Sequence, residues 1–390
     1  MYMSVSTPSY EFRSVPRILC EAGALDRAGE LMASLGANRV LVVCDPGIVR
    51  LGFAGQICDV LEQAGCVVDL FSDVNADPPA AIIRQATAQA RAYKADGVLG
   101  IGGGSSLDTA KLVALMINNE QPLESMYGTD QATGQRVPLI LVPTTSGTGS
   151  EVTWVSVVTD DAGQKKAVYA PQLLPDIALL DPCLTLGLPP AVTAATGLDA
   201  MVHAIEAYTS RTRKNPISDG LASTAIRLLG QNLERVLADG NDLAARSAML
   251  QGSLMAGIAF VNASVAAIHG LAYPLGARFH VPHGHSNALV MAPVIRFNLP
   301  AAQPLYAELA THLLGEQFND EHAAASAFVL EMERLVSCSG LETRLSQLNI
   351  PESAIASMAD EVVTSIRRLI DSNPADMSRA DVEAIYRSIF

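Results

Sequence analysis

The first half of the chain alternates between short apolar runs typical of β-strands and longer stretches with helical periodicity. We expect strands at residues 39–44, 66–71, 96–101, 137–142 and 176–181. We expect helices at residues 53–64, 78–93 and 106–118. This β-α-β-α order implies a parallel sheet with helices on its faces. A β-hairpin is expected at 155–169, with its turn at Asp160–Gly163.

The character of the chain changes after Pro189–Pro190, where Ala- and Leu-rich helical runs continue to the end of the sequence. A chain of 390 residues is long for one hydrophobic core. We therefore expect two domains, an α/β domain at 1–190 and an all-helical domain at 191–390.

The formal net charge of −14 argues against binding to nucleic acid or to an anionic membrane surface. Residues 247–277 contain no Asp, Glu, Lys or Arg, but polar residues and Pro274 interrupt them. We interpret this segment as a buried helix and not as a membrane span. The six cysteines form no C-x-x-C motif, and the N-terminus lacks the apolar core of a signal peptide. We expect buried free thiols and a cytoplasmic protein.

Two loops rich in glycine and hydroxyl groups follow predicted strands. Gly102–Ser105 precedes a predicted helix, so its backbone could approach a pyrophosphate at the helix N-terminus. Pro143–Glu151 carries hydroxyl groups that can bind phosphate or ribose oxygens. A plain turn or a surface loop would explain either one alone. Two such loops favour a ligand site, because open α/β sheets bind ligands at the carboxyl ends of their strands.

Asp45 also lies at a predicted strand end. There it could accept a hydrogen bond from a ribose 2′-OH and repel a 2′-phosphate, which favours NAD over NADP. The alternative, that Asp45 is a helix N-cap, agrees equally well with the sequence. Gly103 and Asp108 are further candidate cofactor-binding residues, and we expect Asp108 to cap the loop more than to contact the phosphates.

Asp199 and His203 lie four residues apart in a segment apolar enough to be a buried helix. On a helix their Cβ atoms would be about 5–6 Å apart on one face, so the two side chains could share a metal ion. Four of the seven histidines follow close together further on. A single buried histidine is more often a core residue, but this clustering makes His269 and His283 candidate ligands. One carboxylate oxygen and three imidazole nitrogens suit Zn²⁺ or Fe²⁺.

These motifs together resemble the iron-containing (group III) alcohol dehydrogenases over nearly the whole chain. The similarity lies in Gly102–Lys111, Pro143–Thr153, Ala195–Glu206, His269–Gly276 and Pro282–Gly284. The resemblance implies an N-terminal Rossmann-like dinucleotide-binding domain and an all-α C-terminal domain, an arrangement like that of dehydroquinate synthase. It places the active site in the cleft between them and implies a homodimer or higher homo-oligomer.

Carried over position by position, the metal ligands at the catalytic centre of the family become Asp199, His203, His269 and His283. The positions that contact NAD in the family become Asp45, Asp77, Gly104, Ser105, Thr144, Thr145, Thr148, Lys166 and Leu184.

Some positions depart from the family pattern. Tyr273 stands where lactaldehyde-reductase-like members carry a histidine that is proposed to relay protons. An ordinary tyrosine has a pKa of about 10. We therefore expect Tyr273 to form a hydrogen bond or to pack in the site and not to relay protons. Val155 replaces an Asn of such members, so the pocket should be more apolar, with Trp154 and Phe260 nearby. His280 and His285 flank a candidate ligand and are expected to line the cleft.

These features predict an NAD-dependent oxidoreductase for a small primary or secondary alcohol and its aldehyde or ketone, with NADP less favoured. A bound Fe²⁺ or Zn²⁺ would polarise the alcohol oxygen, and the nicotinamide would accept the hydride. One alternative is a maleylacetate reductase-like enzyme, whose acidic substrate Arg278 could bind. The other, a dehydroquinate synthase-like lyase, would need several Lys and Arg near the metal and is the less favoured reading.

Overall fold

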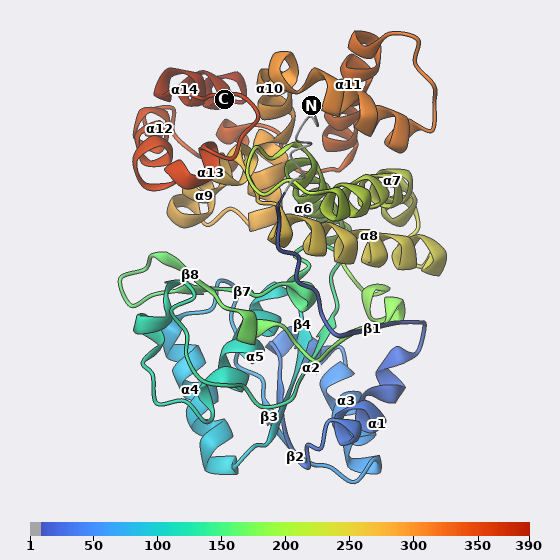
Figure 1. Ribbon diagram of the computed structural model, residues 1–390, viewed down its shortest axis with the longest axis vertical. Coiled ribbons are helices and arrows are strands. Elements are labelled where there is room, and N and C mark those ends of the chain that lie inside the picture. The colour runs from blue at the N-terminus through green and yellow to red at the C-terminus, as the bar shows by residue number, and fades with distance from the viewer. Residues whose placement is uncertain (1–8) are drawn as a thin grey trace, which may run out of the picture.

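The computed structural model describes residues 9–390, with an α/β part below a helical part in Figure 1. A six-stranded sheet in the order β1-β9-β6-β4-β2-β3 forms the centre of the α/β part. Its strands are β1 (Arg17–Cys20), β2 (Arg39–Val43), β3 (Val67–Phe71), β4 (Gly97–Gly102), β6 (Leu139–Pro143) and β9 (Ile177–Leu180). All neighbouring strands in it are parallel, which confirms the predicted fold class.

Helices cover both faces of this sheet: α1 (Ala28–Ser34), α2 (Pro46–Arg50) and α3 (Phe53–Gln63) on one, α4 (Ala80–Tyr93) and α5 (Gly104–Met116) on the other. Successive residues of a strand point to opposite faces. Val40 therefore packs with the first group of helices, whereas Leu41 packs with the second. Burial on both faces explains why the sequences of the central strands β2, β4, β6 and β9 are almost continuously apolar.

The predicted elements of the α/β part are present, with ends displaced by one or two residues. The displacement that matters for function is at α5, which begins at Gly104 and not at Ser106. Gly104 and Ser105 are therefore in the first helical turn, beside the free N–H groups of the helix. Strand β1 and helix α2 had no counterpart in the sequence prediction.

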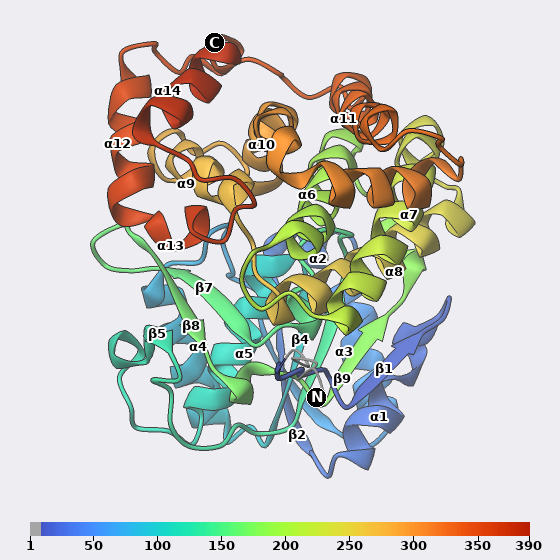
Figure 2. The ribbon, with the colours of Figure 1, turned by 45° about the horizontal axis from the view of Figure 1, so that its top comes forward.

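The expected hairpin is also present. Strands β7 (Val155–Thr159) and β8 (Lys165–Tyr169) are antiparallel, and the Gly163 N–H donates to the Asp160 carbonyl across the turn at 2.9 Å. With β5 (Gly128–Thr129) they form a second, three-stranded sheet, visible beside α4 and α5 in Figure 2.

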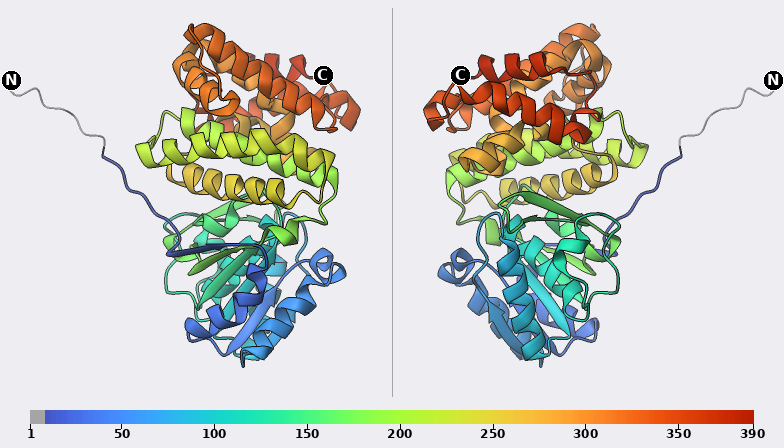
Figure 3. Two further views of the ribbon diagram at one scale, coloured as in Figure 1. Left: turned by 90° about the vertical axis from the view of Figure 1, so that its right-hand side faces the viewer. Right: turned by 90° about the vertical axis from the view of Figure 1, so that its left-hand side faces the viewer.

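The helical part begins with α6 (Pro190–Thr209), and no strand follows β9 among residues 9–390. Its other helices are α7 (Pro216–Ala238), α8 (Leu243–Asn262), α9 (Ala267–Phe279), α10 (His283–Leu314), α11 (Glu321–Cys338), α12 (Ala354–Ser365), α13 (Arg367–Ile370) and α14 (Arg379–Ser388). Helix α8 lies next to the α/β part (Figure 3), where Leu250 and Leu254 pack with Leu180 of β9. The domain boundary near residue 190 stays a prediction.

The sequence predicts one buried helix over residues 247–277, but the structure shows two helices there. The segment forms α8 and α9, which are bent by 103° relative to each other. A carboxylate of α6, that of Glu206, accepts the N–H groups of Ala266 and Ile268 at 2.8 and 2.6 Å, and so starts a new helix there. No single helix in the described chain has the length and hydropathy of a membrane span, and α8 and α9 pass that test only as a bent pair.

The six cysteines are free thiols. Cys44 and Cys66 are buried as expected, whereas Cys20 and Cys338 are exposed. Cys20 is the last residue of the edge strand β1, and Cys338 is the last residue of α11. Both positions have one side that no other element of residues 9–390 covers. The expectation of buried thiols is therefore wrong for these two residues.

Candidate active site

Four side chains from three helices converge on one point: Asp199, His203, His269 and His283. One ligand atom from each residue lies within 4.8 Å of the other three. Asp199 and His203 project from successive turns of α6, as their spacing predicts. His269 lies in the first turn of α9, and His283 is the first residue of α10. The group is buried except for His283, which is partly exposed.

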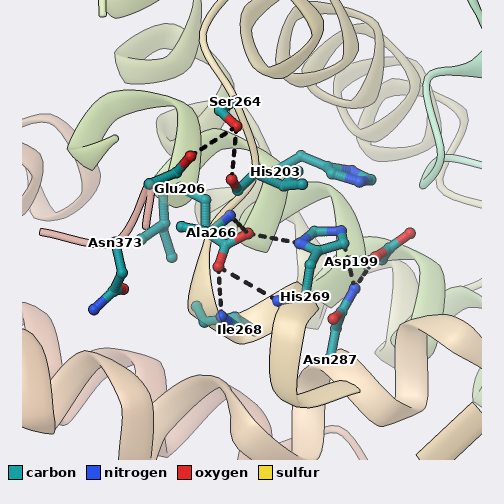
Figure 4. A network of polar contacts seen from close by, with 12 residues as sticks. Asp199, His203, Glu206, Ser264, Ala266, Ile268, His269, Asn287 and Asn373 are labelled. Atoms are coloured by element: carbon teal, nitrogen blue, oxygen red, sulfur yellow. Dashed lines mark hydrogen bonds and ion pairs between the residues drawn. The ribbon is translucent and has the colours of Figure 1, made fainter. Parts of the chain in front are cut away.

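Hydrogen-bond partners orient Asp199 and His203. The Asn287 amide, one helical turn after His283 on α10, donates to Asp199 Oδ1 at 2.6 Å (Figure 4). His203 Nδ1 lies 3.3 Å from the carbonyl oxygen of Gly147. Because a carbonyl only accepts, Nδ1 is the donor, and the lone pair of His203 is on Nε2.

Glu206 orients the next histidine. Its Oε2 lies 2.6 Å from His269 Nδ1, and both side chains are buried (Figure 4). Although burial alone would lower it, the Glu206 carboxylate raises the pKa of His269 above its ordinary value. His269 Nε2 is on the opposite side of the ring, 3.3 Å from the Asn287 amide nitrogen, and so faces the group.

Electrostatics prepare the group for a cation. Burial lowers the pKa of His203 to about 3, and it also lowers the pKa of His283. Burial alone would raise the pKa of Asp199, but the three histidines and Asn287 lower it below its ordinary value. These shifts favour neutral imidazoles at His203 and His283 and an ionised carboxylate at Asp199, which are the protonation states that metal binding requires. One carboxylate oxygen with three imidazole nitrogens fits a divalent transition metal.

The two loops rich in glycine lie side by side at the carboxyl ends of β4 and β6. The Thr144 N–H donates to the Gly102 carbonyl at 3.0 Å. Gly104 lies so close to Thr148 that a Cβ atom on the glycine would be 2.9 Å from Thr148 Cγ2. Gly103 is the N-cap of α5, and no side chain caps this helix. Its open N–H groups and the narrow space beside Gly104 fit a pyrophosphate.

Asp45 is the N-cap of α2, as one of the two sequence alternatives proposes. Its Oδ1 accepts the Gly47 N–H at 2.7 Å, and its Oδ2 accepts the Ser106 hydroxyl at 3.2 Å. The carboxylate thus lies beside the first turn of α5, at the same sheet edge as the glycine loop. A ribose contact from this position stays a prediction.

A cleft of about 550 Å³ is lined by the candidate metal ligands and by part of the two glycine-rich loops. Of the predicted residues, it is lined by Asp77, Gly104, Ser105, Asp108, Thr148, Val155, Lys166, Phe260, Tyr273 and the four candidate metal ligands. Outside this lining lie Asp45, Gly103, Thr144, Thr145, Leu184 and also Trp154, which corrects the expectation that Trp154 lies near the pocket. Leu184 is buried in the sheet core with Cys44 and Ile48, so its side chain supports the sheet edge from within.

Asp108 connects α5 to the second loop, as its expected capping role requires. Its carboxylate accepts the Ser150 hydroxyl at 2.6 Å and the Val157 N–H at 2.8 Å. The completely buried Lys111 donates to the same hydroxyl at 2.8 Å and to the Val155 carbonyl at 2.9 Å. These bonds fix the loop to α5, while a direct cofactor contact of Asp108 stays a prediction.

The loop also packs against the helical part. Gly149 and Gly257 of α8 face each other, and a Cβ atom on Gly149 would lie 2.6 Å from the Gly257 Cα. Because neither residue has a side chain, the loop can approach α8 closely while its Gly147 carbonyl reaches His203. This approach joins the second glycine-rich loop to the metal-ligand group.

Aromatic side chains surround the ligands. The Phe260 ring stacks on His203 with centroids 4.3 Å apart, and the Tyr273 ring is 6.4 Å from that of His283. Burial raises the pKa of Tyr273 far above its ordinary value, so its phenol is neutral near pH 7. A neutral phenol in the cleft wall can pack or donate a hydrogen bond, which are the roles expected from the sequence.

His280 and His285 do not line the cleft, which corrects that expectation. His280 is exposed and ends α9 in the left-handed conformation, with φ of 56°. His285 is buried, with its Nε2 2.8 Å from the carbonyl oxygen of Glu342. On α10, His285 comes two residues after His283, which places it about 200° around the helix axis and so away from the cleft.

Glu206, Asn287 and Lys111 were not identified from the sequence as functional. Glu206 follows His203 by three residues, and Asn287 follows His283 by four. These spacings place each one on the same helix face as a candidate ligand. A polar residue at such a spacing in an apolar helix is a signal that could have found both.

Comparisons with known proteins match nearly all of the chain. The profile of "Iron-containing alcohol dehydrogenase" matches residues 16–182, and that of "Fe-containing alcohol dehydrogenase family, C-terminal" matches residues 193–390. The "Long-chain-alcohol dehydrogenase 1" of Geobacillus thermodenitrificans is 42% identical over 372 residues, which cover 94% of this chain and 93% of that protein.

Solved structures are similar over the full length. The crystal structure of a 1,3-propanediol oxidoreductase has a TM-score of 0.94 and 32% identity, and the match covers 98% of this chain and 100% of that one. A sulfoacetaldehyde reductase from Bifidobacterium kashiwanohense, solved in complex with NAD⁺, has a TM-score of 0.89 and 27% identity. That match covers 98% of this chain and 99% of the reductase.

Proposed function

This chain belongs to the iron-containing alcohol dehydrogenase family, and on that premise we propose that it interconverts an alcohol and its aldehyde or ketone with a nicotinamide cofactor. The observation that carries this proposal is the convergence of one carboxylate and three imidazoles within 4.8 Å. The same cleft also reaches Gly104 and Thr148 of the glycine-rich loops. A metal and a dinucleotide could therefore bind in the same cleft.

Asp199, His203, His269 and His283 would hold the metal, with Fe²⁺ proposed and Zn²⁺ equally suited to the donor set. When bound, the metal would supply Lewis-acid polarisation of the alcohol oxygen, and the nicotinamide would accept a hydride from the alcohol carbon. The chain's own contribution is orientation. Asn287, Gly147 and Glu206 hold three of the four ligands in place.

We propose NAD as the cofactor. The open N-terminus of α5 and the narrow space at Gly104 would hold its pyrophosphate. Asp45, at the end of β2, would accept a hydrogen bond from the adenosine ribose and repel a 2′-phosphate. An NAD⁺ complex of a structural relative supports this choice over NADP.

The substrate end of the cleft favours an apolar alcohol. Val155, Phe260 and Val265 line the same cleft as the metal-ligand group, and Phe260 stacks on His203. Such side chains exclude water from the reacting carbon and gain free energy when they bury alkyl groups, about 0.8 kcal/mol per CH₂. The relative named as a long-chain-alcohol dehydrogenase supports the same choice. We therefore propose primary alcohols with an unbranched alkyl chain as the preferred substrates.

The acidic-substrate alternatives are not favoured. Arg278 lies outside the cleft lining, where it donates to the Ser357 hydroxyl at 2.8 Å and is 4.0 Å from the Glu361 carboxylate. Arg368 does reach the cleft, but it donates to the Tyr169 hydroxyl at 2.9 Å and lies over that ring. Both guanidinium groups are thus engaged by other side chains and do not form a free carboxylate-binding site.

The test is an NADH-absorbance assay after anaerobic loading with Fe²⁺ or Zn²⁺. The panel contains linear alcohols of increasing length, short diols, the matching aldehydes and one aldehyde acid. We expect turnover that depends on metal and rises with chain length. No turnover of any alcohol or aldehyde by fully loaded enzyme would contradict the proposal, and preference for the aldehyde acid would restore the acidic alternative.

We further propose a cytoplasmic homodimer or higher homo-oligomer. The six free thiols favour a reducing compartment, and the family resemblance suggests the assembly. Light scattering of the purified protein measures its mass directly, and a monomer at working concentrations would contradict this proposal.

A further inference from the structure

We propose that Glu206 is a positioning residue with two linked tasks: it fixes the tautomer of His269 and it caps the helix that carries that histidine. The inference rests on the proposed metal site. It means that one buried carboxylate supports both metal binding and the bend between α8 and α9.

The first task follows from the contact between the two side chains. Glu206 Oε2 is 2.6 Å from His269 Nδ1, and Glu206 is only 2% exposed. Both Glu206 oxygens accept backbone N–H groups and so act as acceptors, and Nδ1 is then the donor that carries the proton. The lone pair of His269 is then on Nε2, the nitrogen that faces Asn287 and the other ligands. Partners of this kind orient the imidazole and raise its basicity as a ligand.

The second task follows from the start of α9. Ala266 is its N-cap, yet no side chain of the helix itself caps it. Instead, Glu206 accepts the N–H groups of Ala266 at 2.8 Å and of Ile268 at 2.6 Å, and it is 3.4 Å from the N–H of His269 (Figure 4). A negative charge at a helix N-terminus also interacts favourably with the helix dipole.

The two tasks are linked because α9 begins where the charge-free segment bends by 103°. Glu206 is on α6, three residues after the ligand His203. The same helix therefore supplies two ligands and also holds the backbone that presents the third. Loss of the carboxylate would free both the ring and the first turn of α9.

A conservative substitution separates the tasks in part. In Glu206→Gln the amide oxygen, at the position of Oε1, can still accept the Ile268 N–H, whereas the Ala266 N–H loses the acceptor that it has at Oε2. Its NH₂ group, placed beside Nδ1 of His269, would donate to that nitrogen and move the imidazole proton to Nε2. The Nε2 lone pair needed by a metal would then be lost. Glu206→Ala removes both tasks and also leaves backbone N–H groups without a buried partner.

The measurement is Zn²⁺ affinity by chelator competition, together with thermal unfolding of the metal-free protein. We expect Glu206→Gln to bind Zn²⁺ about 10- to 100-fold more weakly, with a metal-free melting temperature between those of the wild type and of Glu206→Ala. Glu206→Ala should lose affinity and melt at a lower temperature. The matched control is Glu308→Gln. The Glu308 carboxylate accepts a hydrogen bond from the Tyr208 hydroxyl of α6 at 2.5 Å but contacts no candidate ligand. The Zn²⁺ affinity of this variant should be unchanged.

Wild-type affinity in Glu206→Gln would overturn the inference and leave a purely structural cap. Absence of Zn²⁺ binding by the wild type would overturn the proposed function, and this inference with it. Because neither readout uses enzymatic activity, a wrong substrate choice cannot produce either result.

Discussion

The backbone at Gly284 lies directly against the carbonyl group of Ala195, where a Cβ atom on the glycine would overlap the carbonyl oxygen. This contact brings the start of α10 against α6. It also places His283, the preceding residue, beside Asp199, with His283 Nε2 3.6 Å from Asp199 Oδ1. The distance between two candidate ligands on different helices therefore depends on the absence of one methyl group.

Gly284→Ala should consequently weaken metal binding. The added methyl group has no room, so α10 must shift away from α6 at a cost of about 1–3 kcal/mol. We expect a lower melting temperature and a clear loss of Zn²⁺ affinity, measured by chelator competition. Gly220→Ala on α7 is the control, because a Cβ there has no atom within 4 Å. That variant should be stabilised by up to about 1 kcal/mol and should bind metal normally; equal behaviour of both variants would contradict this account.

Asp45→Asn should relax the choice of cofactor without loss of stability. Asparagine keeps the N-cap of α2 but removes the charge that would repel a 2′-phosphate. We expect kcat/KM for NADP to rise at least about tenfold relative to that for NAD. Asp45→Ala should relax the choice similarly and also lose about 1 kcal/mol of stability. An unchanged cofactor ratio in Asp45→Asn would remove Asp45 from the cofactor site.

The sequence was sufficient for features that depend on local spacing or on strand ends. Asp199 and His203 could be paired because a helix fixes the relation of residues four apart. The glycine loops could be placed because every parallel strand ends at the same sheet edge. The distant ligands His269 and His283 were only candidates until the family motifs were considered.

Features that depend on packing between helices could not be predicted. The bend between α8 and α9 depends on Glu206, a residue of α6 that lies about 60 residues earlier in the sequence. No local pattern marks which backbone N–H groups a distant carboxylate will accept. His285 shows the reverse error, because its clustering with His283 suggested the cleft while its ring contacts Glu342 elsewhere.

Glu151 should make stability depend on pH. Burial raises the pKa of its carboxyl from the ordinary 4.5 to about 7, and its Oε1 has no hydrogen-bond partner among the residues described. Between these pH values the folded chain binds more protons than the unfolded chain. The free energy of unfolding should therefore fall by about 3 kcal/mol as pH rises through this window.

Glu151→Gln cannot ionise and should lack this contribution. Urea unfolding of both proteins at pH 4.5, 6 and 8 gives the difference in their free energies of unfolding. We expect the free energy of unfolding of Glu151→Gln, relative to that of the wild type, to increase by about 3 kcal/mol from pH 4.5 to pH 8. A difference that does not change with pH would show that Glu151 ionises normally in the folded protein.

Val155→Asn should change substrate preference. Val155 lines the cleft at the first residue of β7, and an amide there would lose apolar contact with an alkyl chain and offer hydrogen bonds to a hydroxyl. We expect kcat/KM for hexan-1-ol to fall about tenfold relative to that for propane-1,2-diol. Val155→Ala enlarges the pocket without adding polarity and should keep the preference for the apolar alcohol. If both variants shift alike, pocket volume and not polarity governs the choice.

The central claim is that four side chains from α6, α9 and α10 hold one metal ion in the cleft. Anomalous diffraction from crystals of the Zn²⁺- or Fe²⁺-loaded protein, recorded at the metal absorption edge, tests it most directly. We predict a single strong peak about 2.0–2.2 Å from an Asp199 oxygen and from nitrogens of His203, His269 and His283. A peak at any other place in the molecule, with none among these four side chains, would contradict the account.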